Sequence, residues 1–224
     1  MAAGGVSSAE ASAALERLCR TYWYPLYAYV RRRGYSQHDA EDLTQGFLAH
    51  LLAHSFLEGV GRTKGKFRSF LLASLQNFMA DQRDRAGALK RGAGQSLISL
   101  NLEEAAARYE GEPVDNLSPD KLFDRGWAMA LLARAQARLK DEYMTEGKPE
   151  LYEALRQFNA TGPGEVTYGE VAAQLAMPEN TLKSLVHRSR RRYRQLLREE
   201  IAQTVSTLAE VDEEIRYLLQ VASV

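Results

Sequence analysis

The chain has few residues that could build a covalent crosslink or a metal site. It contains one cysteine, Cys19, and four histidines among 224 residues. A single cysteine excludes an intrachain disulfide and disfavours a thiolate cage around zinc. His50 and His54 lie four residues apart and could share a helical face, but no third ligand accompanies them. We therefore expect no metal site and no cofactor.

Long apolar runs are also missing, and the first residues do not have the pattern expected of a secretion leader. No apolar stretch approaches the roughly 18 residues that a membrane-spanning helix needs. The first residues, "MAAGGVSSAEASAA", lack a basic segment followed by a leucine-rich core. We expect residues 1–12 to be a disordered tail, the protein to be cytoplasmic, and no membrane to be among its partners.

The sequence lacks the common catalytic signatures. It has no G-x-S-x-G motif, no dinucleotide glycine fingerprint and no convincing cysteine–histidine pair. The stretch "GRTKGKF" has the composition of a phosphate loop, but its spacing is wrong and Phe67 replaces the required serine or threonine. We therefore expect that the protein is not an enzyme.

Net charge is zero, with 29 basic and 29 acidic residues, but the charges are segregated. Residues 101–124 hold seven acids and two bases, and residues 199–224 hold six acids and one base. Residues 183–198 hold seven lysines or arginines and no acid. Because the local field rather than the total charge steers a polyanion, the basic segment predicts a polyanionic partner.

Apolar residues recur with a period near 3.6 almost throughout the chain, and no segment reads convincingly as a strand. This pattern predicts an all-α fold. We expect two helical modules joined by an acidic linker, with an amphipathic helix at the C-terminus. The expected segments are the tail 1–12, a first module 13–92, a linker 93–119, a second module 120–204 and a C-terminal helix 205–224.

Local capping signals support several helix starts. Ser36 is a good N-cap, and acids follow it in the first helical turn. Thr167 with Glu170 forms a capping box, and Thr207 with Glu210 predicts a second one. These signals place helices after residues 36, 167 and 207.

The basic segment belongs to a helix-turn-helix pattern. A short capped helix over 168–175 is followed by the turn "AMPEN" and by a longer helix from Glu179. An inward stripe is predicted at Leu182, Val186, Ser189, Tyr193 and Leu196. The early residues of the longer helix are placed to read base edges in duplex DNA, and the later arginines to contact phosphates. The first set is Asn180, Thr181, Lys183, Ser184, His187 and Arg188, and the second is Arg190, Arg191 and Arg194. The alternative is a solvated arginine face balanced by Glu199 and Glu200.

Three stretches resemble a known family. "DAEDLTQGFLAHLL" at 39–52 and "GKFRSFLLASLQNFMADQRDR" at 65–85 resemble the two helices of conserved region two of bacterial sigma factors. The closest group is the small extracytoplasmic-function (ECF) type. "VTYGEVAAQLAMPENTLKSLVHRSRRRYRQLL" resembles region four of the same family. The resemblance extends over about residues 15–198.

The resemblance implies that core RNA polymerase and promoter DNA are the partners; an anti-sigma factor is a further candidate that the sequence does not name. Region two would bind polymerase and open the downstream promoter element, while region four would read the upstream element. The implied polymerase contacts are Asp39, Glu41, Asp42, Leu43 and Gln45. The implied melting contacts are Lys64, Lys66, Gln76, Asn77, Asp81, Gln82, Arg83 and Arg85.

The chain departs from the family pattern in three places. Gly46 occupies the usual glutamate position, where a glycine within a helix costs about 1 kcal/mol relative to alanine. "PELYEALRQFNATGPG" replaces the usual opening of region four, and the tail after Arg198 is extra. We hypothesise that the tail packs against region four or a partner and weakens DNA binding by the free protein. The alternative is a plain C-terminal helix that completes a core.

Two other functions fit the same residues. One is a helix-turn-helix regulator that binds DNA without docking on polymerase. The other is a helical protein-interaction module.

Overall fold

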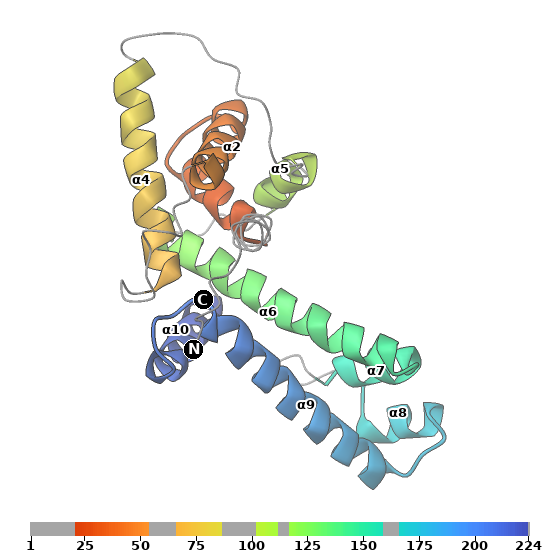
Figure 1. Ribbon diagram of the computed structural model, residues 1–224. Coiled ribbons are helices and arrows are strands. Elements are labelled where there is room, and N and C mark those ends of the chain that lie inside the picture. The colour runs from red at the N-terminus through yellow and green to blue at the C-terminus, as the bar shows by residue number, and fades with distance from the viewer. Residues whose placement is uncertain (1–20, 54–65, 87–101, 112–116, 159–165, 224) are drawn as a thin grey trace. The chain divides into compact units, whose positions relative to one another are not determined.

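The computed structural model describes residues 21–53, 66–86, 102–111, 117–158 and 166–223. Every regular element in these ranges is a helix, which confirms the all-α prediction (Figure 1). None of the described helices combines the length and the apolar character needed to span a bilayer. The helices are 21–32, α2 (Gln37–Ala53), α4 (Phe67–Ala86), α5 (Leu102–Gly111), α6 (Pro119–Thr145), α7 (Pro149–Arg156), α8 (Tyr168–Gln174), α9 (Glu179–Ala202) and α10 (Ala209–Ala222).

The chain divides into two compact units. The first comprises the described residues of Met1–Ala130 and Thr204–Val224, and the second is Leu131–Gln203. The division falls inside α6, whereas the sequence placed a boundary before residue 120. It also assigns α10 to the first unit rather than to a separate segment. A continuous amphipathic helix gives no sequence signal at the point where its packing partners change.

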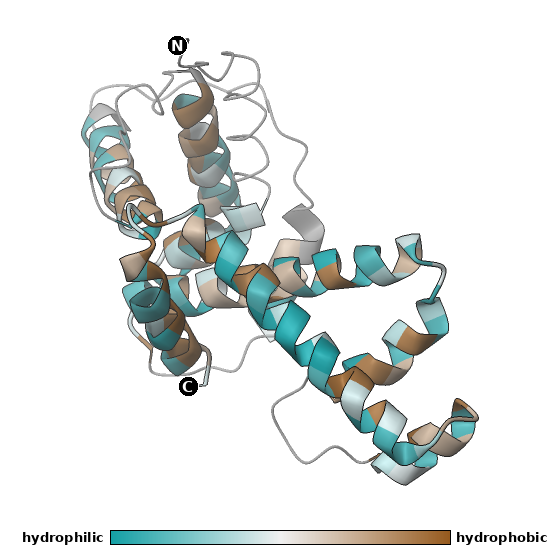
Figure 2. Ribbon diagram, turned by 60° about the horizontal axis from the view of Figure 1, so that its bottom comes forward, coloured by the Kyte–Doolittle hydropathy of each residue, from teal (hydrophilic) through white to brown (hydrophobic). Residues whose placement is uncertain are grey.

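Aromatic residues fill the core of the first unit. The rings of Tyr22 and Trp127 stack with centroids 3.6 Å apart, and both residues are buried. Gly126 lets α6 approach the helix 21–32 closely, because a β-carbon there would lie 3.2 Å from Pro25 Cγ. Figure 2 shows where hydrophobic and hydrophilic residues lie along the helices.

The predicted linker contains a helix, which corrects the sequence expectation. In α5, Ala105 and Ala106 are buried, and the guanidinium of Arg108 lies 3.7 Å from the ring centroid of Tyr24. The ring of Tyr109 meets that of Tyr27 edge-on at 6.3 Å. The acids, glycines and prolines around this short stretch hid the helix in the sequence. Its contacts are with Tyr24 and Tyr27 of the helix 21–32.

The C-terminal helix is attached to the first unit by buried ionic contacts. Arg68 Nε on α4 donates to Glu214 Oε1 on α10 over 3.0 Å, and the same guanidinium donates to Asp124 on α6. The Tyr217 hydroxyl also donates to Asp124, and Lys66 Nζ lies 2.9 Å from Glu214 Oε2. These contacts support the alternative of a helix that completes a core, here that of the first unit, and correct the expectation that the tail packs on region four. Packing of the tail on a partner and its weakening of DNA binding remain predictions.

The caps of two helices test the local predictions. Ser36 Oγ accepts a hydrogen bond from the Asp39 amide over 3.1 Å, so the predicted N-cap of α2 is confirmed. At α10 the N-cap is Leu208, without a side-chain bond, so the predicted capping box is wrong. Glu210 supplies half of it, because its carboxylate accepts from the amides of Ser206 (2.9 Å) and Thr207 (3.0 Å).

Candidate nucleic-acid interface

Helices α8 and α9 of the second unit are joined by a tight turn, in the order and at the positions where the sequence predicted a helix-turn-helix. Thr167 Oγ1 accepts from the Glu170 amide over 3.3 Å, and Glu170 Oε2 accepts from the Thr167 amide over 2.8 Å. The capping box is thus confirmed. The pKa of Glu170 is lowered mainly by the hydrogen bond that its carboxylate accepts from the Thr167 amide.

The turn between the two helices is closed by backbone hydrogen bonds. The Met177 amide donates to Ala172 O over 3.0 Å, and the Ala176 amide donates to Ala173 O over 3.2 Å, which is the Schellman pattern. Ala176 has φ +50°, a left-handed conformation that glycine usually supplies. Pro178, with φ −61°, then starts α9. The turn therefore fixes the point from which α9 leaves.

A small core holds α9 against α8 and α7. Leu182 and Val186 are buried together with Val171 of α8 and Leu155 of α7. Ser189 and Leu196 are buried farther along α9, as the inward stripe predicted. Tyr193, which completes the stripe, is half-buried and donates its hydroxyl to Leu132 O over 3.3 Å. Burial raises the pKa of Tyr193.

The opposite face of α9 is exposed, as predicted. The exposed residues are Asn180, Thr181, Lys183, Ser184, His187, Arg188, Arg190, Arg191 and Arg194. Among the described residues, the side chains of His187, Arg188, Arg191 and Arg194 make no hydrogen bond or ion pair. We name these four, together with Lys183, the α9 cationic face.

Three members of the predicted contact sets have partners within the protein. One is Ser184, whose Oγ donates to the Asn180 carbonyl of the preceding turn over 3.0 Å, and the other two are cations. Lys183 Nζ pairs with Glu179 Oε1 at 2.6 Å, across one exposed helical turn, where such pairs are weak. Arg190 differs, because its Nε donates to the Phe158 carbonyl over 2.9 Å and its Nη2 donates to the same oxygen. Arg190 thus secures the chain after α7, which the sequence could not show, and its predicted phosphate contact is less available.

The acids at the end of α9 neutralise a different set of arginines. Glu199 pairs with Arg138 of α6 at 2.7 Å, and Glu200 pairs with Arg138 at 2.8 Å and with Arg134. Arg192 Nε donates to Glu142 of α6 over 2.8 Å. These contacts join α9 to the second half of α6, so Glu199 and Glu200 do not balance the α9 cationic face as the solvated-helix alternative assumed.

These ion pairs shift the titration of two carboxylates. The hydrogen bond from Arg192 lowers the pKa of Glu142, and the hydrogen bond from Arg138 lowers the pKa of Glu199. Both groups remain more than one-third exposed. Their ionised forms therefore favour the folded second unit modestly.

The predicted polymerase contacts all lie on α2 in the first unit. Three are acids with local partners. Ser36 Oγ donates to Asp39 Oδ2 over 2.6 Å, Gln37 donates to Glu41 over 3.0 Å, and Asp42 lies 3.6 Å from His38. The other two, Leu43 and Gln45, are partly exposed.

Gly46, the departure within that set, lies against α4. A β-carbon on Gly46 would lie 3.4 Å from Phe78 Cζ, so an alanine would make ordinary contact and a longer side chain would press on the ring. The rings of Phe47 and Phe78 also meet, with centroids 5.7 Å apart. The glycine therefore accommodates a close helix–helix contact.

The predicted melting contacts fall mainly on α4. Lys64 and the side chain of Arg85 lie outside the described residues. Gln76 is exposed but bonded, since its Nε2 donates to the Tyr29 hydroxyl over 2.9 Å. Asn77, Asp81 and Arg83 are exposed, and Gln82 is partly exposed.

Lys66 has a structural role that its position in a basic, glycine-rich stretch did not suggest. It is held by Glu213 at 3.2 Å and Glu214 at 2.9 Å, and only 23% of its side chain is exposed. The predicted contact of Lys66 with DNA would require breaking a pair that attaches α10.

Histidine and carboxylate positions give no metal cluster in the part of the chain that the structure describes. His50 packs near Phe78 with ring centroids 5.6 Å apart, and His54 lies outside the described residues.

Comparisons of the chain with protein-family models, with curated proteins and with solved structures found no match. A function must therefore be argued from the residues and contacts described above.

Proposed function

We propose that the chain is a sigma factor of the ECF type, which binds core RNA polymerase, directs it to a class of promoters and helps to melt them. The observation that carries the proposal is the α9 cationic face, on the second helix of a helix-turn-helix. Among the described residues, only one of its members, Lys183, has an ionic partner, the exposed Glu179 one turn away. The resemblance of α2, α4 and the helix-turn-helix to sigma regions two and four supplies the rest.

The α9 cationic face has the arrangement that duplex DNA requires. Residues near the start of a recognition helix reach base edges, and Asn180, Thr181 and Ser184 are exposed there. Arg191 and Arg194 continue along the same helix and would contact phosphates, and Arg188, which the sequence pattern grouped with the base-reading residues, is here assigned to a phosphate with them. With four cationic contacts to phosphate, log K for duplex binding should fall as log salt concentration rises, with a slope of about −4.

In this proposal the first unit binds the polymerase and the melted strand. The exposed acids of α2 offer a negative surface to a basic partner, and the polar side chains of α4 offer edges and charge to unstacked bases. The polymerase performs the chemistry, and this chain contributes binding energy and specificity.

One observation favours the second candidate, a DNA-binding regulator that does not dock on polymerase. Gly46 replaces the expected glutamate and is packed near Phe78, so one acidic group of the docking surface is missing. A helical protein-interaction module is the third candidate, and it predicts no binding to duplex DNA.

Run-off transcription separates these candidates. Core polymerase would be supplied with genomic fragments, with or without the full chain, and with an Arg188→Ala/Arg191→Ala variant. The proposal expects discrete transcripts that need the wild-type chain, and their loss in the variant. Arg156→Ala is the matched control, because this exposed arginine of the second unit pairs only locally with Glu153. The regulator would be favoured instead if the chain bound duplex DNA but gave no transcripts and did not co-purify with polymerase.

A further inference from the structure

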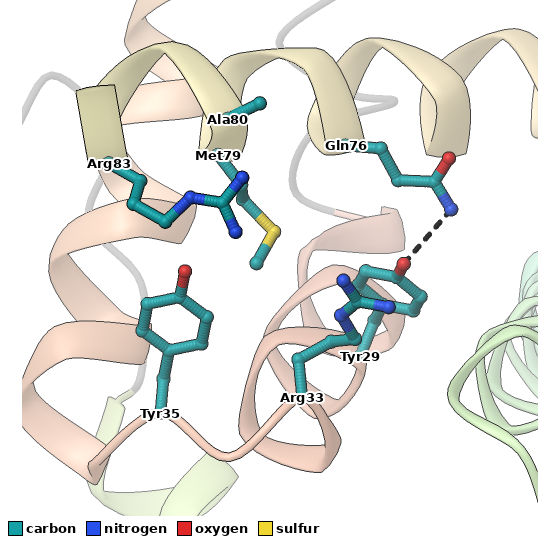
Figure 3. Close-up of a pocket in the computed structure, with 7 residues that line it drawn as sticks. All are labelled: Tyr29, Arg33, Tyr35, Gln76, Met79, Ala80 and Arg83. Atoms are coloured by element: carbon teal, nitrogen blue, oxygen red, sulfur yellow. Dashed lines mark hydrogen bonds between the residues drawn. The ribbon is translucent and has the colours of Figure 1, made fainter. Parts of the chain in front are cut away.

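A small pocket lies in the first unit between the end of the helix 21–32 and α4 (Figure 3). It has a volume of about 80 Å³. Its lining includes Tyr29, Arg33, Tyr35, Gln76, Met79 and Arg83. No carboxylate lines it among the described residues.

Two arginines from different elements border this pocket without an anionic partner. Arg33 ends the first helix and Arg83 lies on the facing side of α4 (Figure 3). Neither guanidinium makes a hydrogen bond or an ion pair within the described part of the chain. Two like charges held at one opening repel each other, and an anion between them would remove that repulsion.

The floor of the pocket is held by a hydrogen bond and by buried aromatic packing. Tyr29 is 1% exposed, and its hydroxyl accepts a hydrogen bond from Gln76 Nε2 over 2.9 Å (Figure 3). The ring of Tyr29 also meets the buried ring of Phe123 edge-on at 6.5 Å. A ligand would therefore meet a surface that needs little reorganisation, which favours affinity.

A turn brings the second tyrosine to the same opening. Gly34 has φ +93°, a conformation that favours glycine, and its amide donates to Arg31 O over 3.0 Å. The chain reverses there, so Tyr35 follows Arg33 closely and its hydroxyl points toward α4 (Figure 3). This hydroxyl adds a neutral donor beside the two cations.

We propose that this pocket is a binding site for a phosphoryl group, held by Arg33 and Arg83 with the Tyr35 hydroxyl as a further donor. Guanidinium groups bind phosphate oxygens in a bidentate manner, and the small volume suits a compact oxyanion better than a large organic ligand. The phosphoryl group comes either from a free phosphate compound or from the backbone of a single DNA strand. With a DNA strand as the source, the site rests on the proposed function, in which Arg83 of α4 contacts the melted strand; with a free phosphate compound as the source, it does not.

The test uses the full chain and inorganic phosphate at constant ionic strength, with chloride as the balancing anion. The Met79 methyl resonance, assigned through a Met79→Leu variant, reports on the pocket itself. We expect it to shift saturably with phosphate. Each arginine removed should raise the Kd about tenfold, the worth of a charge-assisted hydrogen bond.

An Arg33→Gln/Arg83→Gln variant tests the two cations, and Lys121→Gln/Lys140→Gln removes the same charge from exposed positions that do not line the pocket. The proposal expects loss of the Met79 shift only in the arginine variant. Arg33→Lys/Arg83→Lys, which keeps the charge, should restore part of the binding and guards against a folding defect. Equal losses in the glutamine and control variants, or no saturable Met79 shift in the wild-type chain, overturn the proposal.

A second titration identifies the source of the phosphoryl group. A thymidine oligonucleotide and a nucleoside diphosphate would each compete with phosphate for the Met79 signal. Competition by the oligonucleotide assigns the site to a DNA strand, and competition by the diphosphate alone assigns it to a free phosphate compound. Both results support a phosphoryl site, whereas failure of both competitors overturns it.

Discussion

Two sets of basic residues, one in each unit, are used in opposite ways. In the first unit, Lys66 and Arg68 are enclosed by acids from α6 and α10 and hold a helix in place. In the second unit, Arg188, Arg191 and Arg194 are exposed and have no acidic partner within the described chain. The position of a basic residue relative to acids, rather than its type, therefore decides whether it holds the fold together or is available to bind a partner.

The largest expected effect comes from the enclosed cations. Arg68→Ala leaves Glu214 and Asp124 buried without their main counter-charge, so the free energy of unfolding of the first unit should fall by about 3–5 kcal/mol. Denaturant unfolding followed by tryptophan fluorescence measures this, because Trp127 lies in that core. The matched control is Arg216→Ala, an exposed arginine on α10 with only a local backbone bond. Comparable losses from both variants would remove the distinction.

The next effect concerns the exposed cations. Arg188→Ala/Arg191→Ala should weaken binding to duplex DNA about 100-fold, at about tenfold for each charge-assisted contact, and should leave unfolding nearly unchanged. Arg190→Ala should instead lower the thermal stability and weaken DNA binding less than the double variant, because Arg190 donates to the Phe158 carbonyl and its loss loosens the chain after α7. Fluorescence anisotropy and thermal unfolding of the same samples separate the two. If Arg190→Ala weakens DNA binding as much as the double variant, its assignment to the fold is wrong.

A smaller effect concerns the turn that presents α9. Ala176→Gly should raise the free energy of unfolding of the second unit by about 1 kcal/mol, since glycine adopts φ +50° without the steric cost that alanine carries. Ala173→Gly, at an exposed helical position in α8, should lower it by about the same amount. Thermal unfolding of the two variants would show shifts of opposite sign. Shifts of the same sign would mean that the turn is not under this strain.

The smallest effect is a pH dependence of the second unit. Lowered pKa values in the folded state mean that Glu142 and Glu199 stabilise the unit above the ordinary glutamate pKa of about 4.3, and that this stabilisation is lost as pH falls through the folded values. Because both groups are more than one-third exposed, the contribution should stay below about 1 kcal/mol. Denaturant unfolding between pH 7 and acidic pH measures it. Glu142→Gln should reduce the acid loss, and an unchanged loss would show that the Arg192 pair does not cause it.

Local features of the fold were predictable from the sequence, and long-range contacts were not. The Ser36 cap, the Thr167–Glu170 box and the buried stripe of α9 follow from residues within one or two helical turns. The pair of Arg68 with Glu214 joins residues 146 positions apart, and no local pattern reports it. The role of Arg190 is similar, because its partner Phe158 lies 32 positions away across segments that a helical period does not connect.

The candidate sites divide in the same way. The exposure of the α9 cationic face follows from helical spacing, since the buried stripe leaves only one outward side. The enclosure of Lys66 depends on the fold of α10, whose acids read as a separate charge block in the sequence. The pocket at Arg33 and Arg83 was also hidden, because its two cations lie 50 positions apart, one in the turn after the helix 21–32 and one on α4.

The most direct test of the account is the salt dependence of duplex binding by the full chain. Fluorescence anisotropy across a range of salt concentrations should give a slope of log K against log salt of about −4 for the wild-type chain, and about −2 for Arg188→Ala/Arg191→Ala, because each phosphate contact contributes about −0.9. A slope that the double variant leaves unchanged, or the absence of duplex binding at low salt, would contradict the claim that the α9 cationic face is a nucleic-acid interface.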